Sequence, residues 1–568
     1  MLARLVLGTL AAVLLGSAPA QAQVFTVTVS GDTGPGSLRT LADGAGNGDT
    51  VAIPASVSPI TLTTQIVIKK SITIAGAGAG VVSIHAGSNN RVFEISDDGA
   101  SHPSVTISGV TITGGNAGAE GGGGVEVDPL ESLTLSEVVV TGNSTTLGWA
   151  GGGVKNNAGT LVIRRSTISG NVSGSDGGGV GAESISSDNP TTTISDSVVS
   201  GNSTPMGRAG GGVANFGGAL TIERSTISGN TSLGDASGVA SEEAGTGSNG
   251  AMTLVDSTVV GNMGPAMGRQ GAGVYFLVQP GHPIVLVNDT IAGNTAASGA
   301  GGLEGGDIPP SVVNTIVAGN SGEAGKENCQ FLVGMDTPFV SGGHNLENGA
   351  TCQFTRPGDL SNTDPLLGPL QDNGGPTPTR APTPSSPAIG AADPTKCPAT
   401  DQRGVPYFAP NPCDIGAVDL ARPAPLVPAP PATGAAISKL GIHPTTFSAA
   451  ARGGSIAKRK KRHVGTTVSY TQLVAGKTRF VVRVPRAGVH THSGTCVKRS
   501  KRHKRGRRCT RFVSVGSFAR AGTAGANSFH FTGRVRHHKL RPGRYRLDAT
   551  AKAAGKARTV KKRFRIVP

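Results

Sequence analysis

The feature that most constrains this chain is an internal repeat that closes on Gly-Asn. Successive Asn residues are separated by 26 to 32 residues. Each repeat holds short runs of β-branched and aliphatic residues between glycine-rich bends, a pattern typical of strands and turns. One such unit cannot bury its apolar side alone and must stack on its neighbours. The seven repeats end at Asn143, Asn171, Asn202, Asn230, Asn262, Asn294 and Asn320.

Two aliphatic ladders emerge when the repeats are aligned on this Asn. Equivalent residues of successive coils in a parallel β-helix lie ~4.8 Å apart, so the ladders predict a continuous core. We also expect the Asn side chains to bond along the stack and to bend the chain in the left-handed region. The position eight before the Asn holds Leu135, Ile163, Ile194, Ile222, Leu254, Leu286 and Val312. The position three before it holds Val140, Ile168, Val199, Ile227, Val259, Ile291 and Val317.

Charge alternates at the position six before the Asn. A charged binding strip is one interpretation of this pattern. The other, which we favour, is structural, because an acid above and below each Arg removes like-charge repulsion between coils. The residues are Glu137, Arg165, Asp196, Arg224, Asp256, Asn288 and Asn314.

Composition indicates a mostly β chain of more than one domain. At 568 residues the chain is too long for one compact core. Its 87 glycines follow no G-X-Y period, which excludes collagen. Residues 1–436 hold 17 Lys and Arg against 34 Asp and Glu, whereas residues 437–568 hold 34 against one. An acidic body is therefore expected to precede a very basic tail.

The first 22 residues have the pattern of a secretory signal peptide. Arg4 precedes an apolar run, and small residues end at Ala20-Gln21-Ala22. The run is about half the length needed to cross a bilayer, which argues against a membrane anchor. We therefore expect a secreted or extracellular chain without a transmembrane span.

Six cysteines form three sequence-local pairs. An even count in an exported chain favours disulfides, and the spacing lacks the CxxC pattern of zinc sites. Six cysteines allow 15 pairings, and we expect each to pair with its near neighbour. The pairs are Cys329 with Cys352, Cys397 with Cys413, and Cys496 with Cys509.

Two parts of the chain resemble known families. The stretches at 25–27, 36–39 and 72–76 are similar to the N-terminal coils of secreted polymorphic outer membrane protein-like members of the right-handed parallel β-helix family. The resemblance implies an extracellular location and a β-helix fold. A second set resembles the choice-of-anchor Q domain and implies a segment that covers the open end of the helix. That set comprises residues 364–368, 373–377, 386–389, 401–404 and 414–417.

The basic tail is predicted to be a separate small β-sandwich, most simply immunoglobulin-like. Alternating segments such as TRFVVRV and GRYRLDATA indicate about seven short antiparallel strands. Its charge is either a solvated surface or a site for an anionic cell-wall polymer or acidic polysaccharide, and we expect the latter, with no specific nucleic acid. The candidate polyanion-binding residues are Lys458, Arg459, Lys460, Lys461, Arg462, Lys498, Arg499, Lys501, Arg502, Lys504, Arg505, Arg507 and Arg508.

Enzymatic activity is the competing interpretation of the helix. Lys155 is expected beside Glu126 on the adjacent coil, and Glu183 and Glu242 are expected two coils apart with Phe216 between them. No Asp pair or His marks a cleft, so solvated surface acids are the preferred reading. No cofactor or metal is expected.

The sequence therefore predicts an all-β protein, a right-handed parallel β-helix followed by a small antiparallel sandwich. A non-catalytic adhesin-like or wall-associated scaffold is the expected function, and a polysaccharide lyase or glycoside hydrolase acting on an acidic glycan is the alternative. The expected boundaries are a signal peptide at 1–22, the helix at 23–328, the capping segment at 329–420, a Pro/Ala linker at 421–436 and the basic domain at 437–568.

Overall fold

The structure is a computed structural model in which two compact units, 1–423 and 424–568, have separate internal contacts. The predicted signal peptide, apart from Ala22, and the predicted linker lie outside the described residues. Described are residues 22–87, 90–97, 101–146, 151–185, 188–207, 209–243, 249–264, 271–306, 308–332, 339–407, 413–420, 437–457, 464–472, 476–491, 494–500, 506–523, 525–536, 538–553 and 556–568.

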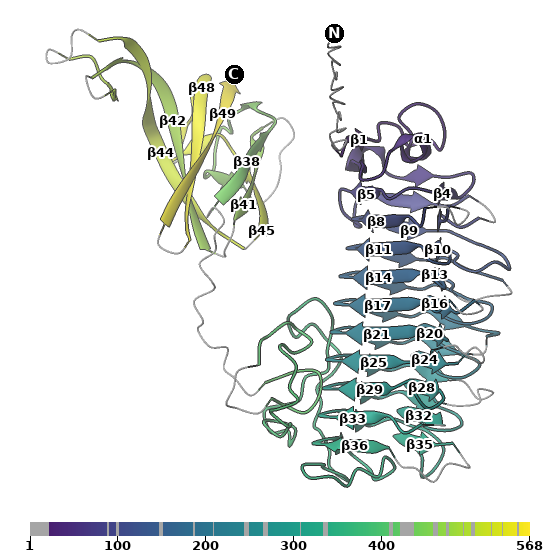
Figure 1. Cartoon of the computed structure of the whole chain (residues 1–568). Helices are drawn as coiled ribbons and strands as arrows, with labels where there is room; N and C mark the ends of the chain where they lie inside the picture. Colours follow the sequence, from purple (N-terminus) through teal and green to yellow (C-terminus); the bar gives the residue numbers. More distant parts are fainter. Residues whose placement is uncertain are drawn as a thin grey trace, which may run out of the picture. The chain divides into compact units, whose positions relative to one another are not determined.

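The first unit is a parallel β-solenoid, which confirms the predicted β-helix (Figure 1). Each coil places one strand in each of three long parallel sheets, named A, B and C here. Sheet A contains β1 (Val24–Thr26), β2 (Thr50–Ile53), β5 (Thr73–Gly76), β8 (Ser104–Ser108), β11 (Ser132–Ser136), β14 (Thr160–Arg164), β17 (Thr191–Ser195), β21 (Ala219–Glu223), β25 (Met252–Val255), β29 (Ile284–Val287), β33 (Ser311–Val313) and β36 (Val340–Gly343).

Sheet B contains β3 (Ile60–Thr61), β6 (Ser83–His85), β9 (Thr111–Thr113), β12 (Val139–Thr141), β15 (Thr167–Ser169), β18 (Val198–Ser200), β22 (Thr226–Ser228), β26 (Thr258–Val260), β30 (Thr290–Ala292), β34 (Ile316–Ala318) and β37 (Leu346–Glu347). Sheet C contains β4 (Ile66–Ile68), β7 (Phe93–Ile95), β10 (Val125–Val127), β13 (Val154–Asn157), β16 (Val180–Glu183), β20 (Val213–Phe216), β24 (Val239–Glu242), β28 (Val274–Leu277), β32 (Leu303–Gly306) and β35 (Cys329–Phe331). A fourth, short sheet contains β19 (Ser203–Thr204), β23 (Thr231–Ser232), β27 (Met263–Gly264) and β31 (Thr295–Ala296).

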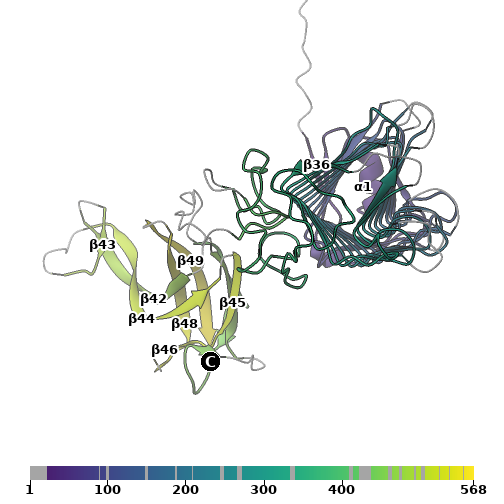
Figure 2. The same cartoon turned by 90° about the horizontal axis from the view of Figure 1, so that it is seen from below.

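The aliphatic ladders form the core as predicted. Ile227 pairs in register with Val199 below it and Val259 above it, and all three are fully buried. The other members of the two ladders are equally buried. Viewed along the axis, the stacked strands enclose this core (Figure 2).

The Asn ladder bonds along the stack, but it does not bend the chain. Asn230 Nδ2 donates to Asn262 Oδ1 at 2.9 Å, and the same bond recurs from coil to coil at 2.9 to 3.0 Å. The left-handed bend instead falls on the glycine before each Asn, where φ lies between 61° and 68°. The predicted bend at Asn is therefore wrong, because glycine adopts positive φ without steric cost and leaves the Asn free to bond.

The charged position six before the Asn is also a left-handed corner. Its residues have φ between 45° and 57°, although none is glycine. Arg165 contacts Glu137 at 3.0 Å and Arg224 contacts Asp196 at 2.8 Å, each across one coil step. These ion pairs support the structural interpretation of the alternating charges.

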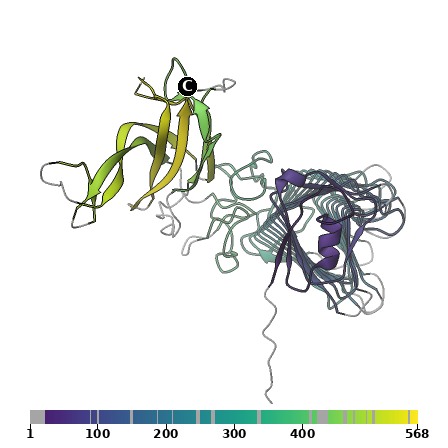
Figure 3. The ribbon, with the colours of Figure 1, turned by 90° about the horizontal axis from the view of Figure 1, so that it is seen from above.

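The two ends of the solenoid are filled differently. At the N-terminal end, α1 (Leu38–Gly44) lies across the opening with Leu38 and Ala42 buried, followed by the 3-10 turn Ala55–Val57 (Figure 3). At the other end, Phe339, Cys352 and Phe354 join the helix core. The following loops to residue 420 pack along the side of the last coils (Figure 1).

The second unit is a small two-sheet sandwich with its own aromatic core. One sheet contains β38 (Ile437–His443), β41 (Thr466–Gln472), β45 (Gly525–Phe531) and β40 (Ile456–Ala457). The larger sheet contains β39 (Thr446–Ser448), β49 (Lys556–Val567), β48 (Gly543–Ala553), β42 (Gly476–His490), β43 (Cys496–Val497) and β44 (Arg508–Gly522), and a hairpin joins β46 (Arg534–Val535) to β47 (His538–Lys539). The predicted antiparallel β domain is confirmed, although β42 and β44 are 15 residues long, not short.

All three predicted disulfides are present. They join Cys329 to Cys352, Cys397 to Cys413, and Cys496 to Cys509. No helix in the described part of the chain is long and apolar enough to cross a membrane.

Candidate functional site

The carboxylates singled out from the sequence lie at the expected register of sheet C. Glu183 ends β16 and Glu242 ends β24, and both pair with Phe216 of β20, which therefore lies between them. Both glutamates are partly exposed. That they are surface acids stays a prediction, with a catalytic role as the alternative.

A different group of charged residues gathers nearer the N-terminal end of the same sheet. Glu94 of β7, Glu126 of β10 and Lys155 of β13 occupy one outward ladder, since each is paired with the next in register. Arg91 precedes β7, and Glu120 lies in the loop before β10. We call these five residues the charged cluster.

Three carboxylates of the charged cluster converge on one guanidinium. The Arg91 Nη atoms contact Glu94 at 3.2 Å, Glu120 at 3.1 Å and Glu126 at 2.6 Å. Lys155 Nζ contacts Glu126 at 3.1 Å and donates to the Glu120 carbonyl. Arg91, Glu126 and Lys155 are buried, whereas the side chain of Glu94 is 19% exposed and that of Glu120 is 76% exposed. Solvent therefore reaches the cluster at Glu94 and Glu120.

Burial changes the acidity of the cluster. It raises the pKa of Glu126, and the positive charges of Arg91 and Lys155 only partly oppose this. Burial also raises the pKa of Glu94, against the opposing charge of Arg91. Asp128 is close enough to raise the pKa of both groups. Carboxyl groups with raised pKa values can give and take protons nearer neutral pH.

A second polar group adjoins the charged cluster at the corner between sheets C and A. Asp97, His102 and Glu131 each offer one ligand atom, and these atoms lie within 4.8 Å of one another. Burial and the nearby Asp97 raise the pKa of Glu131 to about 8. His102 is exposed, with Nδ1 3.9 Å from Glu131 Oε1. Two carboxylates and an imidazole could hold a divalent cation.

The fold itself does not demand charge at this ladder position. At the equivalent pairing, the next three strands of sheet C hold Gly181, Ala214 and Ala240, and the last three hold Tyr275, Glu304 and Gln330. Ala214 and Ala240 belong to a small apolar cluster outside the main core. The charged cluster is thus confined to the early coils, although an alanine satisfies the same register.

Sequence reasoning found two of the five residues of the charged cluster. The neighbouring Lys155 and Glu126 are confirmed by their ion pair. Arg91 and Asp97 were missed, because both precede the seven aligned repeats and lie in irregular segments. At the corner, His102 adopts φ of 49° and its Nδ1 lies 3.9 Å from Glu131 Oε1, a grouping that the sequence analysis did not identify.

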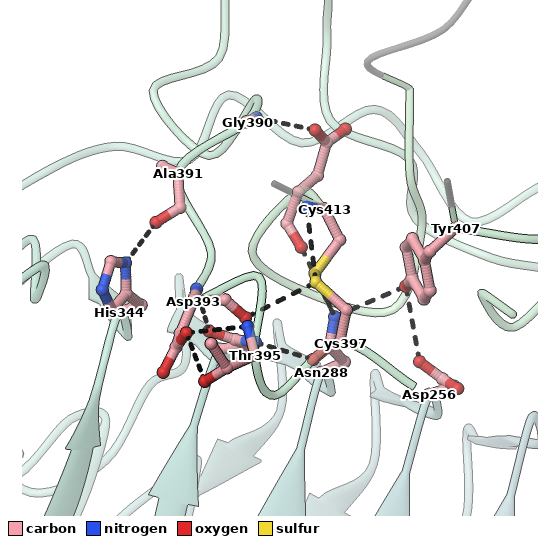
Figure 4. Close-up of a disulfide and its surroundings, with 12 residues drawn as sticks. Asp256, Asn288, His344, Gly390, Ala391, Asp393, Thr395, Cys397, Tyr407 and Cys413 are labelled. Carbon is pink, nitrogen blue, oxygen red and sulfur yellow. Dashed lines mark hydrogen bonds between the residues drawn. A yellow bond between two sulfur atoms is a disulfide. The ribbon is translucent and has the colours of Figure 1, made fainter. Parts of the chain in front are cut away.

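A third polar site lies where the loops after residue 354 meet the helix (Figure 4). Tyr407 donates a long 3.5 Å bond to Asp256, and Asn288 Nδ2 contacts the Cys413 sulfur at 3.5 Å. Burial, together with the charges of Asp289 and Asp401, raises the pKa of Asp256 to about 9. The site is closed and holds the segment against the coils, so its role is structural.

The predicted polyanion-binding residues lie in the second unit. Lys498, Arg499, Arg507 and Arg508 are exposed near the Cys496–Cys509 disulfide. The remaining candidates, Lys458, Arg459, Lys460, Lys461, Arg462, Lys501, Arg502, Lys504 and Arg505, lie outside the described residues. Binding by either run stays a prediction.

No family model and no curated protein matches the chain. The solved structures that align with it include the pectate lyase Pel9A, at 12% identity over 70% of this chain and 97% of that chain, with a TM-score of 0.41. A mannuronic acid-specific polysaccharide family 6 lyase from human gut microbiota aligns at 12% identity over 60% and 92%, with a TM-score of 0.25. The family 6 alginate lyase AlyGC aligns at 13% identity over 77% and 63%, with a TM-score of 0.25.

These comparisons correct the expected function. The neighbours are polysaccharide lyases, which contradicts the predicted non-catalytic scaffold and agrees better with the alternative. All three TM-scores lie below 0.5, so the function proposed below is argued from the residues of the site. The resemblance to a choice-of-anchor Q domain and to polymorphic outer membrane protein-like coils stays a prediction, since no family model matches.

Proposed function

We propose that the first unit is an enzyme that cleaves an acidic polysaccharide at the charged cluster, by the elimination reaction of a polysaccharide lyase. The observation that supports this most is the convergence of three carboxylates on Arg91 beside Lys155, where the fold accepts glycine or alanine. Burying ion pairs carries a desolvation cost that the stack does not require. Clusters with shifted pKa values are typical of functional sites.

Elimination requires positive charge near the substrate and a base, and the charged cluster contains both. Arg91 and Lys155 provide positive charge, which lowers the cost of the carbanion that forms beside a uronate carboxylate. Glu94 is the partly exposed carboxylate with a raised pKa, so it is the candidate base. It would take the proton from C5, the bond from C4 to the bridging oxygen would break, and that oxygen would take a proton from water. An unsaturated uronate end is the product.

The substrate and the location of the enzyme belong to the same proposal. The elimination removes a proton beside a carboxylate, so the proposed substrate is a carboxylate-bearing glycan, and such polymers are extracellular. The three disulfides are typical of an oxidising compartment and support an extracellular protein. The predicted signal peptide would deliver it there.

The test is to incubate the full chain with polygalacturonate and with alginate and to follow both ultraviolet absorbance of unsaturated ends and new reducing ends. Glu94→Gln and Lys155→Met should each lower turnover roughly 100-fold or more, as loss of an acid–base or electrostatic group does. Glu183→Gln serves as the matched control and should retain activity. Reducing ends without unsaturation would replace elimination by hydrolysis, and the absence of both products would refute the proposal.

A further inference from the structure

The outer face of the larger sheet in the second unit carries opposed arginines. Along β48, Tyr545 and Leu547 point into the core, so Arg544 and Arg546 lie on the opposite face. Arg544 pairs directly with Arg565 of β49, and Arg546 pairs with its Arg563. On its other side, Arg546 pairs with Arg483 of β42. Like charges at directly opposite positions destabilise a sheet.

Internal acids do little to neutralise this face. Asp548 is the single acidic residue in 437–568. Its carboxylate contacts Arg483 at 2.8 Å and Arg546 at 2.6 Å. The Arg546 guanidinium also lies 3.8 Å from the centre of the Phe512 ring. Two arginines of the face are thus held in place, while Arg544, Arg563 and Arg565 are exposed.

A shallow depression crosses the sheet at these exposed arginines. Its volume is about 580 Å³. Among its lining residues are Thr446 of β39, Arg565 of β49, Arg544 of β48, Pro485 of β42 and Phe512 of β44, one from each of five strands. Five strands at ~4.8 Å spacing span roughly 19 Å. The depression is therefore long enough for an extended polymer and not only for a single small ion.

We infer that this depression is a binding site for a carboxylate-bearing polysaccharide chain. The planar guanidinium donates two parallel hydrogen bonds to a carboxylate, and a bound polyanion would remove the repulsion between the opposed arginines. The Phe512 ring offers an apolar surface beside them. Nucleic acid is the less suitable ligand, because the Cys496–Cys509 disulfide indicates an oxidising compartment. The site would hold polymer whether or not the first unit cleaves it.

The test compares two full-length variants that lose the same charge. The face variant carries Arg544→Gln, Arg563→Gln and Arg565→Gln. The control variant carries Arg452→Gln, Lys477→Gln and Lys539→Gln, three exposed basic residues that do not line the depression. Affinity is measured on immobilised polygalacturonate and on neutral dextran, at low and high salt. The face variant should bind polygalacturonate roughly tenfold or more weakly, whereas the control variant should stay within about twofold of the parent. Neither should bind dextran.

Thermal stability separates loss of a site from loss of the fold. The face variant should melt at the parent's temperature or above it, because the substitutions remove like-charge pairs. Equal loss of affinity in both variants, or parent-like binding by the face variant, would overturn the inference. Tighter binding to duplex DNA than to polygalacturonate at the same salt would also overturn it. Turnover on short oligouronates reports on the first unit alone, so failure there leaves this result intact.

Discussion

At the residue scale, the Asn ladder joins successive coils through buried side-chain bonds. Asn230 is fully buried, accepts from the backbone N–H of Asn202 at 2.9 Å and donates to the Val199 carbonyl at 3.1 Å. Its amide therefore bonds two backbone groups at the corner of the coil. The Gly-Asn spacing alone predicted the ladder, but not the bonds to Val199, because those depend on the corner geometry set by the preceding glycine.

Replacing Asn230 by Ala should cost roughly 2 to 4 kcal/mol of stability, because it leaves buried polar groups unsatisfied. Urea unfolding followed by circular dichroism measures the loss. The exposed neighbour Thr231→Ala is the control and should be near neutral. If the two variants unfold alike, the ladder contributes no more than a surface residue.

The site also shows where residue-level prediction stops. Lys155 and Glu126 follow the repeat pattern, so their pairing could be read from the alignment. Arg91 lies outside the seven aligned repeats, and its convergence with three glutamates depends on loop paths that no periodicity encodes. The ladders were predictable because one spacing is repeated, whereas the cluster occurs once.

At the element scale, a buried acid lies where the loops after residue 354 meet the coils. Asp256 holds its proton in the folded protein up to a pKa of about 9, whereas an unfolded Asp ionises near ~3.9. Unfolding between these values releases a proton, so this group destabilises the fold increasingly as pH rises from about 4 to about 9. This cost is absent only below the unfolded pKa, where Asp256 is protonated in both states.

Asp256→Asn should therefore raise the melting temperature relative to the parent, and the gain should grow from pH 5 to pH 9. The amide keeps a carbonyl that can accept from Tyr407, and it cannot ionise. Differential scanning calorimetry across this range measures the effect, with the exposed Asp43→Asn as a control that should show no such trend. A constant difference at all pH values would contradict the proton linkage.

Strand length is the element-scale feature that the sequence pattern missed. Pro485 lies inside β42, although proline cannot donate to a ladder. In the structure, the pairing of β42 with β48 ends at Arg483, and beyond it β42 continues along β44. Pro485 is thus tolerated where one edge of its strand is open, which is a tertiary property.

At the scale of the whole molecule, the two units have separate hydrophobic cores with no member in common. Thermal unfolding should consequently show two transitions. Ile227→Asp places an unpaired charge in the helix core and should lower the free energy of unfolding of the first unit by several kcal/mol. Only the transition of that unit should therefore move to a lower temperature. Replacing Cys496 and Cys509 by Ser should lower only the other. Calorimetry of the full chain checks both, and a joint shift by either variant would show that the units unfold together.

The loops after residue 354 also restrict how the length of this protein could change by duplication or loss of a coil. Gln402 bonds Thr226 at 2.8 Å and Thr258 at 2.6 Å, on successive coils, and the Ala417 N–H donates to Thr290 on the next one at 3.0 Å. Adding or removing a coil between Thr226 and Thr290 would shift every later contact of these loops by one coil. A coil gained or lost before Thr226 would leave them all unchanged, so variation in length is expected on the N-terminal side, where the charged cluster also lies.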